Sequence, residues 1–265
     1  MIVFDRLKDG KKNALTLSYD DGTIHDRKLV EIMDKNGIRG TFHLNSGRIG
    51  GNNLISSKEI AQLYKNHEVS CHGVMHHTLS SLPAQNIVQE ILEDRRALEK
   101  ASGGIVRGMS YANGIYSDEI INTIKQCGIV YSRTTQNTQN FRLPYDFMKW
   151  NPTCHHKDCI GVGKRFLDSF NGYFACPRLL YIWGHSYEFD REDNWDLIEE
   201  FCQMMSGNED IWYATNIEIY EYISAQKQLV ISADNEIIYN PTAIKIWFSI
   251  DGETKSILPG ETLKL

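Results

Sequence analysis

The sequence predicts an α/β protein built around a parallel β-sheet. Short runs rich in β-branched and aromatic residues alternate with longer segments of helical period, which is the pattern of repeated βα units. A chain of 265 residues is long enough to bury a large core, and its 42% hydrophobic and 23% charged residues are ordinary for a globular protein. These values exclude a disordered, collagen-like or coiled-coil chain.

About seven segments are expected to be strands. They are residues 14–19, 40–44, 68–71, 106–111, 129–132, 179–183 and 211–214. Helices are expected at residues 25–35, 57–66, 84–101, 117–127, 194–206 and 216–225. Two helix starts carry a capping-box pattern, Ser56-x-x-Glu59 and Thr215-x-x-Glu218. Between residues 134 and 178 the alternation fails, and a connection of that length is usually functional or contains unrecognised structure.

The pattern changes near residue 226 and predicts two parts. Residues 1–226 carry the βα units, and residues 227–265 form a small β appendage that packs on them. In the second part short strands are separated by turn signals at Asp234-Asn235 and Asp251-Gly252, and the latter is typical of a hairpin.

Charge and composition exclude several partners. The formal net charge is −6 and no basic run exceeds Lys11-Lys12, so we expect neither nucleic acid nor an anionic membrane as a partner. No stretch approaches the roughly 20 apolar residues of a membrane span, and the first residues lack the features of a signal peptide. The six cysteines are scattered without a Cys-x-x-Cys, so we expect reduced thiols and a cytoplasmic protein. The oligomeric state stays open.

Two adjacent carboxylates end the first predicted strand, in Ser18-Tyr-Asp-Asp-Gly22. The carboxyl ends of parallel strands are where α/β active sites are built. A polar turn is the alternative interpretation. Neighbouring carboxylates point in different directions, so one can bind a metal ion while the other stays free as a base.

Histidines follow the third and the sixth predicted strands. His72 and His76 have the i, i+4 spacing that places two imidazoles on one face of a helical turn. With Asp21 they form the two-His, one-carboxylate set that leaves coordination positions open for water and substrate. His185 ends the strand Tyr181-Ile-Trp-Gly-His185, where it is either a structural histidine or a general acid.

These three motifs, in this order, resemble the polysaccharide deacetylases, the carbohydrate esterases with NodB homology, from about Lys11 to about Ala225. The resemblance implies a distorted (β/α) barrel that holds zinc, or alternatively cobalt, nickel or iron. It also implies removal of acetyl groups from sugars, most often from N-acetylglucosamine units. Carried over by motif, Asp20 is the catalytic base and His185 the general acid. The implied metal ligands are Asp21, His72 and His76.

The sequence departs from the family at its third motif. The family has Arg-Pro-Pro-aromatic-Gly, whose arginine orients the base and whose aromatic residue supplies a backbone N–H to the oxyanion hole. Here the segment is Arg107-Gly-Met-Ser-Tyr-Ala-Asn-Gly114. Aligned on its last glycine it has Ser110 for the arginine and Asn113 for the aromatic residue, and aligned on Tyr111 it has Gly108 for the arginine. Neither alignment keeps the arginine, although Arg107 could reach back to the base.

The fourth motif, an Asp-Trp pair, has only Trp150-Asn-Pro152 as a loose counterpart. The following Cys154–Cys159 segment could line the substrate groove or bind a second zinc ion, and its irregular spacing favours a polar loop over a zinc site. Glu188 and Asp190 are equally well explained as surface carboxylates. The expected substrate contacts are polar residues and flat aromatic faces near the strand ends: Tyr111, Asn113, Trp150, His156 and Trp183.

The sequence therefore predicts a metal-dependent hydrolase that removes acetyl groups from an N-acetylated amino sugar or an acetylated oligosaccharide. In a cytoplasmic protein a small oligosaccharide or soluble glycoconjugate is the better substrate. Two alternatives remain. One is a catalytically degenerate carbohydrate-binding module, which the missing arginine favours. The other is an iron oxygenase with the same ligand set, which the βα pattern disfavours.

Overall fold

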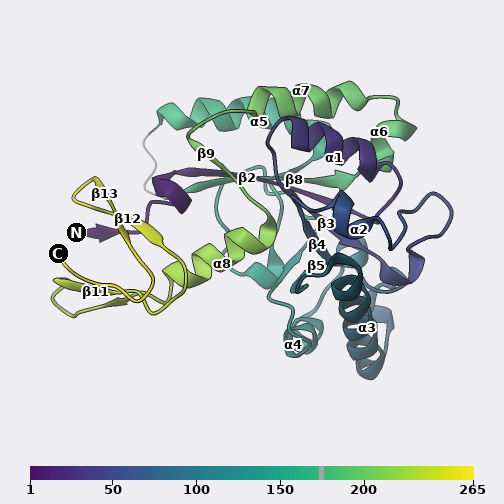
Figure 1. Ribbon diagram of the computed structural model, residues 1–265, viewed down its shortest axis with the longest axis horizontal. Coiled ribbons are helices and arrows are strands. Elements are labelled where there is room, and N and C mark those ends of the chain that lie inside the picture. Colours follow the sequence, from purple (N-terminus) through teal and green to yellow (C-terminus); the bar gives the residue numbers. More distant parts are fainter. Residues whose placement is uncertain (173–175) are drawn as a thin grey trace.

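A parallel sheet forms the centre of the molecule (Figure 1). The computed structural model describes residues 1–172 and 176–265. Within them the eight-stranded sheet has the order β6-β5-β4-β3-β2-β8-β7, with β9 paired to the first half of β2. The strands are β2 (Asn13–Asp20), β3 (Gly40–Leu44), β4 (Glu68–Cys71), β5 (Gly108–Ser110), β6 (Tyr131–Arg133), β7 (Cys154–His155), β8 (Arg178–His185) and β9 (Ile211–Tyr213).

Helices cover the outside of this sheet. Figure 1 shows α1, α5 and α7 together on one side, and α3 and α4 on another. The helices are α1 (Asp26–Lys35), α2 (Ile60–Leu63), α3 (Ala84–Ser102), α4 (Asp118–Gln126), α5 (Cys159–Asp168), α6 (Tyr187–Arg191), α7 (Trp195–Met205) and α8 (Asn216–Gln226). The right-handed βα connections of a parallel sheet place them there.

Alternation along each strand decides which side chains face the interior. In β2, Leu15, Leu17 and Tyr19 belong to the hydrophobic cluster under the helices. Thr16 and Ser18 point the other way, where Ser18 meets His43 of β3. Since side chains of a strand alternate with a period of two, Asp20 faces the interior with Thr16 and Ser18.

The segment between residues 150 and 155 closes the sheet into a distorted barrel. On one side the backbone N–H of Trp150 donates to the carbonyl of Ser132, and Thr134 donates back to the Trp150 carbonyl, at 3.1 and 3.0 Å. On the other side β7 pairs with β8, and Thr153 donates to the carbonyl of Tyr181 at 2.8 Å. This segment therefore joins the two ends of the sheet.

Two small antiparallel sheets lie beside the barrel, next to both chain ends (Figure 1). The first is β1 (Ile2–Val3), β12 (Ile246–Ile250) and β13 (Glu253–Ile257), and the second is β10 (Val230–Ile231), β11 (Ile237–Tyr239) and β14 (Thr262–Lys264). Asp251 and Gly252 have φ of 50° and 87°, as a two-residue hairpin turn requires. Phe248 shares one buried cluster with Trp212 and Tyr222 of the barrel side, so these sheets pack on it.

The predicted fold class is confirmed, and each of the expected strands is present. The region from residue 134 to 178 also contains β7 and α5, which the sequence pattern did not reveal. Gly161 and Gly163 lower the intrinsic helix propensity of α5, and β7 has only 2 residues. In place of the expected helix at 57–66 the structure has only the short helix α2, which begins at Ile60 and ends at Leu63.

One of the two capping boxes is complete. Thr215 and Glu218 cap α8 reciprocally, as predicted. At the other, the Glu59 carboxylate accepts from the Ser56 N–H at 2.6 Å, but Glu59 is itself the residue before the helix. The second box is therefore only half formed.

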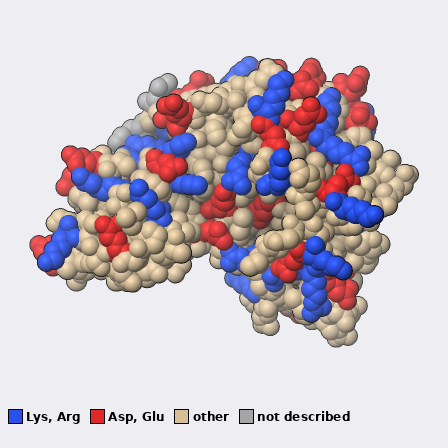
Figure 2. All heavy atoms as spheres, in the orientation of Figure 1, with Lys and Arg blue, Asp and Glu red and all other residues tan. Residues whose placement is uncertain are grey.

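Charges of both signs are mixed on the surface, and the cysteines are unpaired. On the face in Figure 2, Lys and Arg side chains are interspersed with Asp and Glu. The six cysteines are free thiols, as expected. Within the described ranges, no helix has the length and apolar character needed to cross a bilayer.

Candidate active site and metal centre

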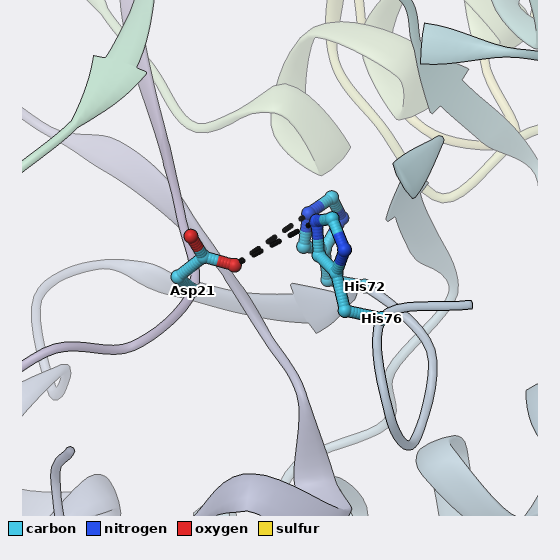
Figure 3. A group of neighbouring side chains, drawn as sticks. All are labelled: Asp21, His72 and His76. Carbon is cyan, nitrogen blue, oxygen red and sulfur yellow. Dashed lines mark ion pairs between the residues drawn. The ribbon is translucent and has the colours of Figure 1, made fainter. Parts of the chain in front are cut away.

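Asp21, His72 and His76 converge at the carboxyl ends of the strands (Figure 3). Oδ1 of Asp21 lies 3.9 Å from Nε2 of His72 and 3.8 Å from Nε2 of His76. The expected helical turn between the histidines is absent, because Gly73 and His76 have φ of 82° and 63° and the segment is a loop. The loop nevertheless brings the two rings to a centroid separation of 4.7 Å.

This arrangement fits a divalent metal ion. The Asp21 Oδ1 atom is buried and has no hydrogen-bond partner, so it is free to coordinate. Zinc bonds to nitrogen and oxygen are about 2.0–2.2 Å long, so two ligands of one ion lie at most about 4.4 Å apart. The distances from Asp21 to both histidines meet this condition while exceeding hydrogen-bond length.

Ser110 fixes the tautomer of His72 that can bind a metal. The Nδ1 atom of His72 lies 3.0 Å from the Ser110 carbonyl oxygen and 2.7 Å from its Oγ. A carbonyl can only accept, so Nδ1 carries the proton and the Nε2 lone pair faces Asp21. Burial lowers the pKa of His72, which keeps the ring neutral near pH 7.

Asp94 of α3 holds the backbone from which His72 projects. Its carboxylate accepts hydrogen bonds from the N–H groups of Ser46, His72 and Gly73 at 2.9, 3.1 and 2.9 Å. Asp94 is fully buried, and this burial raises its pKa to about 6 against the effect of these bonds. The carboxylate therefore connects the loop that carries His72 and His76 to the long helix α3.

Asp20 points away from Asp21 and into the barrel. One carboxylate oxygen accepts from a guanidinium nitrogen of Arg133, and the other accepts from Ser110 Oγ at 3.1 Å. Burial would raise the pKa of Asp20, but the buried Arg133, aided by His72, holds that pKa well below its usual range. Asp20 is therefore an ionised carboxylate in a fixed orientation.

His185 lies beside Asp20, because the two residues are register partners at the ends of β8 and β2. Its Nδ1 is 3.5 Å from Oε1 of Glu188, one turn later. Burial lowers the pKa of His185, but the Glu188 contact and the charges of Asp20 and Asp21 outweigh it and raise the pKa above the ordinary value. The ring therefore favours the protonated form more than a free histidine does.

Several predicted substrate contacts prove to be buried. Tyr111, Trp150 and His156 are only 1%, 1% and 2% exposed, so their side chains are turned into the interior and offer almost no surface in this structure. Trp150 packs edge-on against Tyr131 and Tyr181 inside the barrel. The sequence pattern marked these residues as lying near strand ends but could not show which side chains turn inward.

Asn113 and Trp183 remain accessible. Asn113 is exposed and donates to Thr78 Oγ1 at 2.7 Å. Trp183 is half-buried, donates to Asn137 at 2.8 Å, and lies under the guanidinium of Arg133 at 4.7 Å. An open pocket of about 340 Å³ adjoins Asp21, and its lining includes Arg48 and Tyr187.

Arg133 is the main residue that the sequence interpretation missed. Arg107, the expected replacement, pairs instead with Glu221 on α8 at 2.5 Å. Ser110 contacts Asp20, and the Tyr111 N–H is used by the Arg133 carbonyl at 3.0 Å, so the alignment on Gly114 is the one the structure supports. Alternation places Arg133 on the same face of β6 as Tyr131, two residues earlier, but it does not show that this face reaches Asp20 across the barrel.

The comparisons with known proteins agree with this fold and site. A family model described as polysaccharide deacetylase matches residues 7–132, which include Asp20, Asp21, His72 and His76. Over these residues the chain is similar to the polysaccharide deacetylase family. No curated protein sequence matches it.

Solved structures share the fold. A protein from Mycobacterium smegmatis assigned to the polysaccharide deacetylases is 16% identical, with a TM-score of 0.65 over 85% of this chain and 94% of that one. A family 4 acetyl xylan esterase from Clostridium thermocellum, in complex with a cobalt ion, is 14% identical with a TM-score of 0.52 over 78% and 90%. A mutant of a Bacillus anthracis pseudoenzyme of this family is 18% identical with a TM-score of 0.51 over 79% and 67%.

Proposed function

We propose that the protein is a metal-dependent hydrolase that removes acetyl groups from an N-acetylated amino sugar or an acetylated oligosaccharide. The observation that carries the proposal is the pairing of Asp20 with His185 at neighbouring strand ends. Next to them Asp21 joins the two histidines. A candidate base, a candidate acid and a set of candidate metal ligands thus lie together at the carboxyl ends of the barrel strands.

The ligands would be Asp21, His72 and His76, and two nitrogens with one oxygen suit zinc. When bound, a divalent ion supplies a Lewis acid that polarises an acetyl carbonyl and lowers the pKa of water. Similarity to the family supports this chemistry, and the cobalt ion of the acetyl xylan esterase supports a divalent ion.

Side chains of the protein then accept and donate the protons. Asp20 is held ionised by Arg133, and its orientation is fixed from both oxygens, so it can accept a proton from attacking water. His185 can donate a proton to the departing amine or alcohol, and the contact with Glu188 favours the imidazolium that does so. Trp183 and the pocket beside Asp21 offer surface for a sugar ring.

The test is acetate release from N-acetylated and O-acetylated oligosaccharides by protein stripped of metal and then restored with zinc or cobalt. We expect release only after restoration. Asp20→Asn should keep the metal and lose turnover, whereas His76→Ala should lose the metal at the Asp21 site. Saccharide binding without acetate release at any metal loading would favour the binding module, and near-normal turnover of Asp20→Asn would disprove the assigned base.

A further inference from the structure

A second group of metal-ligating side chains includes His185 and lies outside the group around Asp21. His155 of β7, His185 of β8 and Glu188 of α6 each offer one ligand atom, and these atoms lie within 4.8 Å of one another. Nε2 of His155 is 3.0 Å from Oε2 of Glu188, and Nδ1 of His185 is 3.5 Å from Oε1. None of the three belongs to the group around Asp21.

The group is built into the fold. Glu188 is only 14% exposed, and its Oε2 also lies 3.2 Å from Nε2 of His156. His156 is stacked on Phe189 and Tyr19 with centroid separations of 4.2 and 5.8 Å. This packing fixes the ring that contacts the Glu188 carboxylate. Burial lowers the pKa of His156 to about 3, which makes it a neutral ring able to donate to Glu188.

One polar atom of this group lacks a partner. The Nδ1 atom of His185 is buried and makes no hydrogen bond, although it faces the Glu188 carboxylate. A buried polar atom without a partner costs free energy, and a ligand that pairs with it recovers that cost. An ion between His155, His185 and Glu188 would engage this nitrogen.

We infer that His155, His185 and Glu188 form a second binding site for zinc, separate from the site at Asp21. Two imidazoles and one carboxylate suit zinc, whereas calcium and magnesium require more oxygen ligands. His155 and His185 are 16% and 21% exposed in their side chains, so solvent can reach the group. Binding there does not depend on the reaction.

Its effect on turnover rests on the proposed function. An ion at this site takes the Nδ1 lone pair of His185. The ring then cannot become the imidazolium that donates a proton to the leaving group, because a metal-bound imidazole holds its remaining N–H proton far more tightly. Zinc at the second site therefore inhibits the enzyme.

Binding is tested by equilibrium dialysis of the stripped chain against increasing zinc, with elemental analysis of the bound metal. The wild type should bind two zinc ions, and His155→Ala and Glu188→Gln should bind one. His76→Ala should keep the ion at the second site. His25→Ala is the matched control, because His25 also faces a carboxylate, Asp190 at 3.8 Å, but lies in neither group of three ligands.

Activity gives a second, independent readout. In the wild type, turnover with excess zinc should be at least tenfold lower than turnover with one equivalent of zinc. In His155→Ala these two rates should be nearly equal. One bound zinc in the wild type, or two in both His155→Ala and Glu188→Gln, would overturn the second site. Two bound ions without acetate release at any loading would instead refute the proposed function and leave the site standing.

Discussion

The guanidinium of Arg133 donates a hydrogen bond to the carboxylate of Asp20, although β6 and β2 are separated in the sheet by β5, β4 and β3. The contact exists because the sheet curves into a barrel and both side chains point inward. It places on β6 the positive charge that the family carries in its third motif, where this chain has Ser110.

Replacing Arg133 should therefore impair turnover without removing the metal. Arg133→Met leaves Asp20 buried without its counter-ion, so the carboxylate tends to be protonated and is lost as a base. We expect kcat to fall about 100-fold or more, and zinc affinity to stay within about threefold. Breaking a buried ion pair also costs about 3–5 kcal/mol of stability, which denaturant unfolding would show.

Arg107→Met is the matched control. Arg107 pairs with Glu221 at the partly exposed surface of α8. Because exposed ion pairs contribute little, this variant should keep near-normal kcat and stability. Equal losses of kcat in both variants would contradict the role given to Arg133.

Asp94 should control metal affinity from outside the ligand set. In Asp94→Asn one carboxylate oxygen becomes an NH2 group, which cannot accept. Either the N–H of Ser46 or the N–H groups of His72 and Gly73 then lose their acceptor. We expect zinc affinity to fall about 10- to 100-fold, as for other residues that orient ligands. A competition titration with a chromophoric chelator measures it. Asp118→Asn, on the exposed side of α4, should bind zinc normally.

Glu68 should make stability depend on pH. Burial raises the pKa of Glu68 to about 7, although it accepts from Tyr131, Thr41 and the Ile217 N–H at 2.7, 2.8 and 2.8 Å. Between about pH 4.5 and 7 the folded state thus binds more protons at this site than the unfolded state. Its contribution to the free energy of unfolding therefore falls as pH rises, by at most about 1.4 kcal/mol per unit.

Glu68→Gln removes this titration while keeping the hydrogen bonds. Its amide can donate to the Tyr131 hydroxyl and accept from Thr41 and Ile217. We expect the stability difference between variant and wild type to shift in favour of the variant from pH 5 to 7. Urea unfolding at several pH values in the presence of a chelator measures it, and parallel pH profiles would refute the buried-acid interpretation.

Gly184 should not tolerate a side chain. A Cβ atom there would lie 2.1 Å from Nδ1 of His156, the residue that holds Glu188. Gly184→Ala should lower the free energy of unfolding by about 1–3 kcal/mol through overpacking. Gly161→Ala is the control, because nothing lies within 4 Å of its Cβ position in α5, and it should gain about 0.5–1 kcal/mol. Thermal unfolding of both variants would show whether the signs differ.

Periodicity was enough to predict the parallel sheet, and motif spacing was enough to predict the convergence of Asp21, His72 and His76, whereas the barrel was implied by the family resemblance. Each signal is local: a strand of about five residues, a hairpin dipeptide, or a histidine at a strand end. Arg133 and Glu188 could not be assigned in the same way, because their roles come from barrel curvature and from a turn after β8. The burial of Tyr111 and Trp150 likewise depends on closure by residues 150–155, a region without clear periodicity.

The closing segment links the two ends of the proposed proton path. Trp150 binds the backbone of β6 next to Arg133, and five residues later His155 contacts Glu188. A shift of this one strip would loosen the partner of the base and the partner of the acid together, yet leave Asp21, His72 and His76 in place. Turnover would then be lost while Asp21, His72 and His76 stayed intact, so metal content alone would not distinguish an active chain from an inactive one.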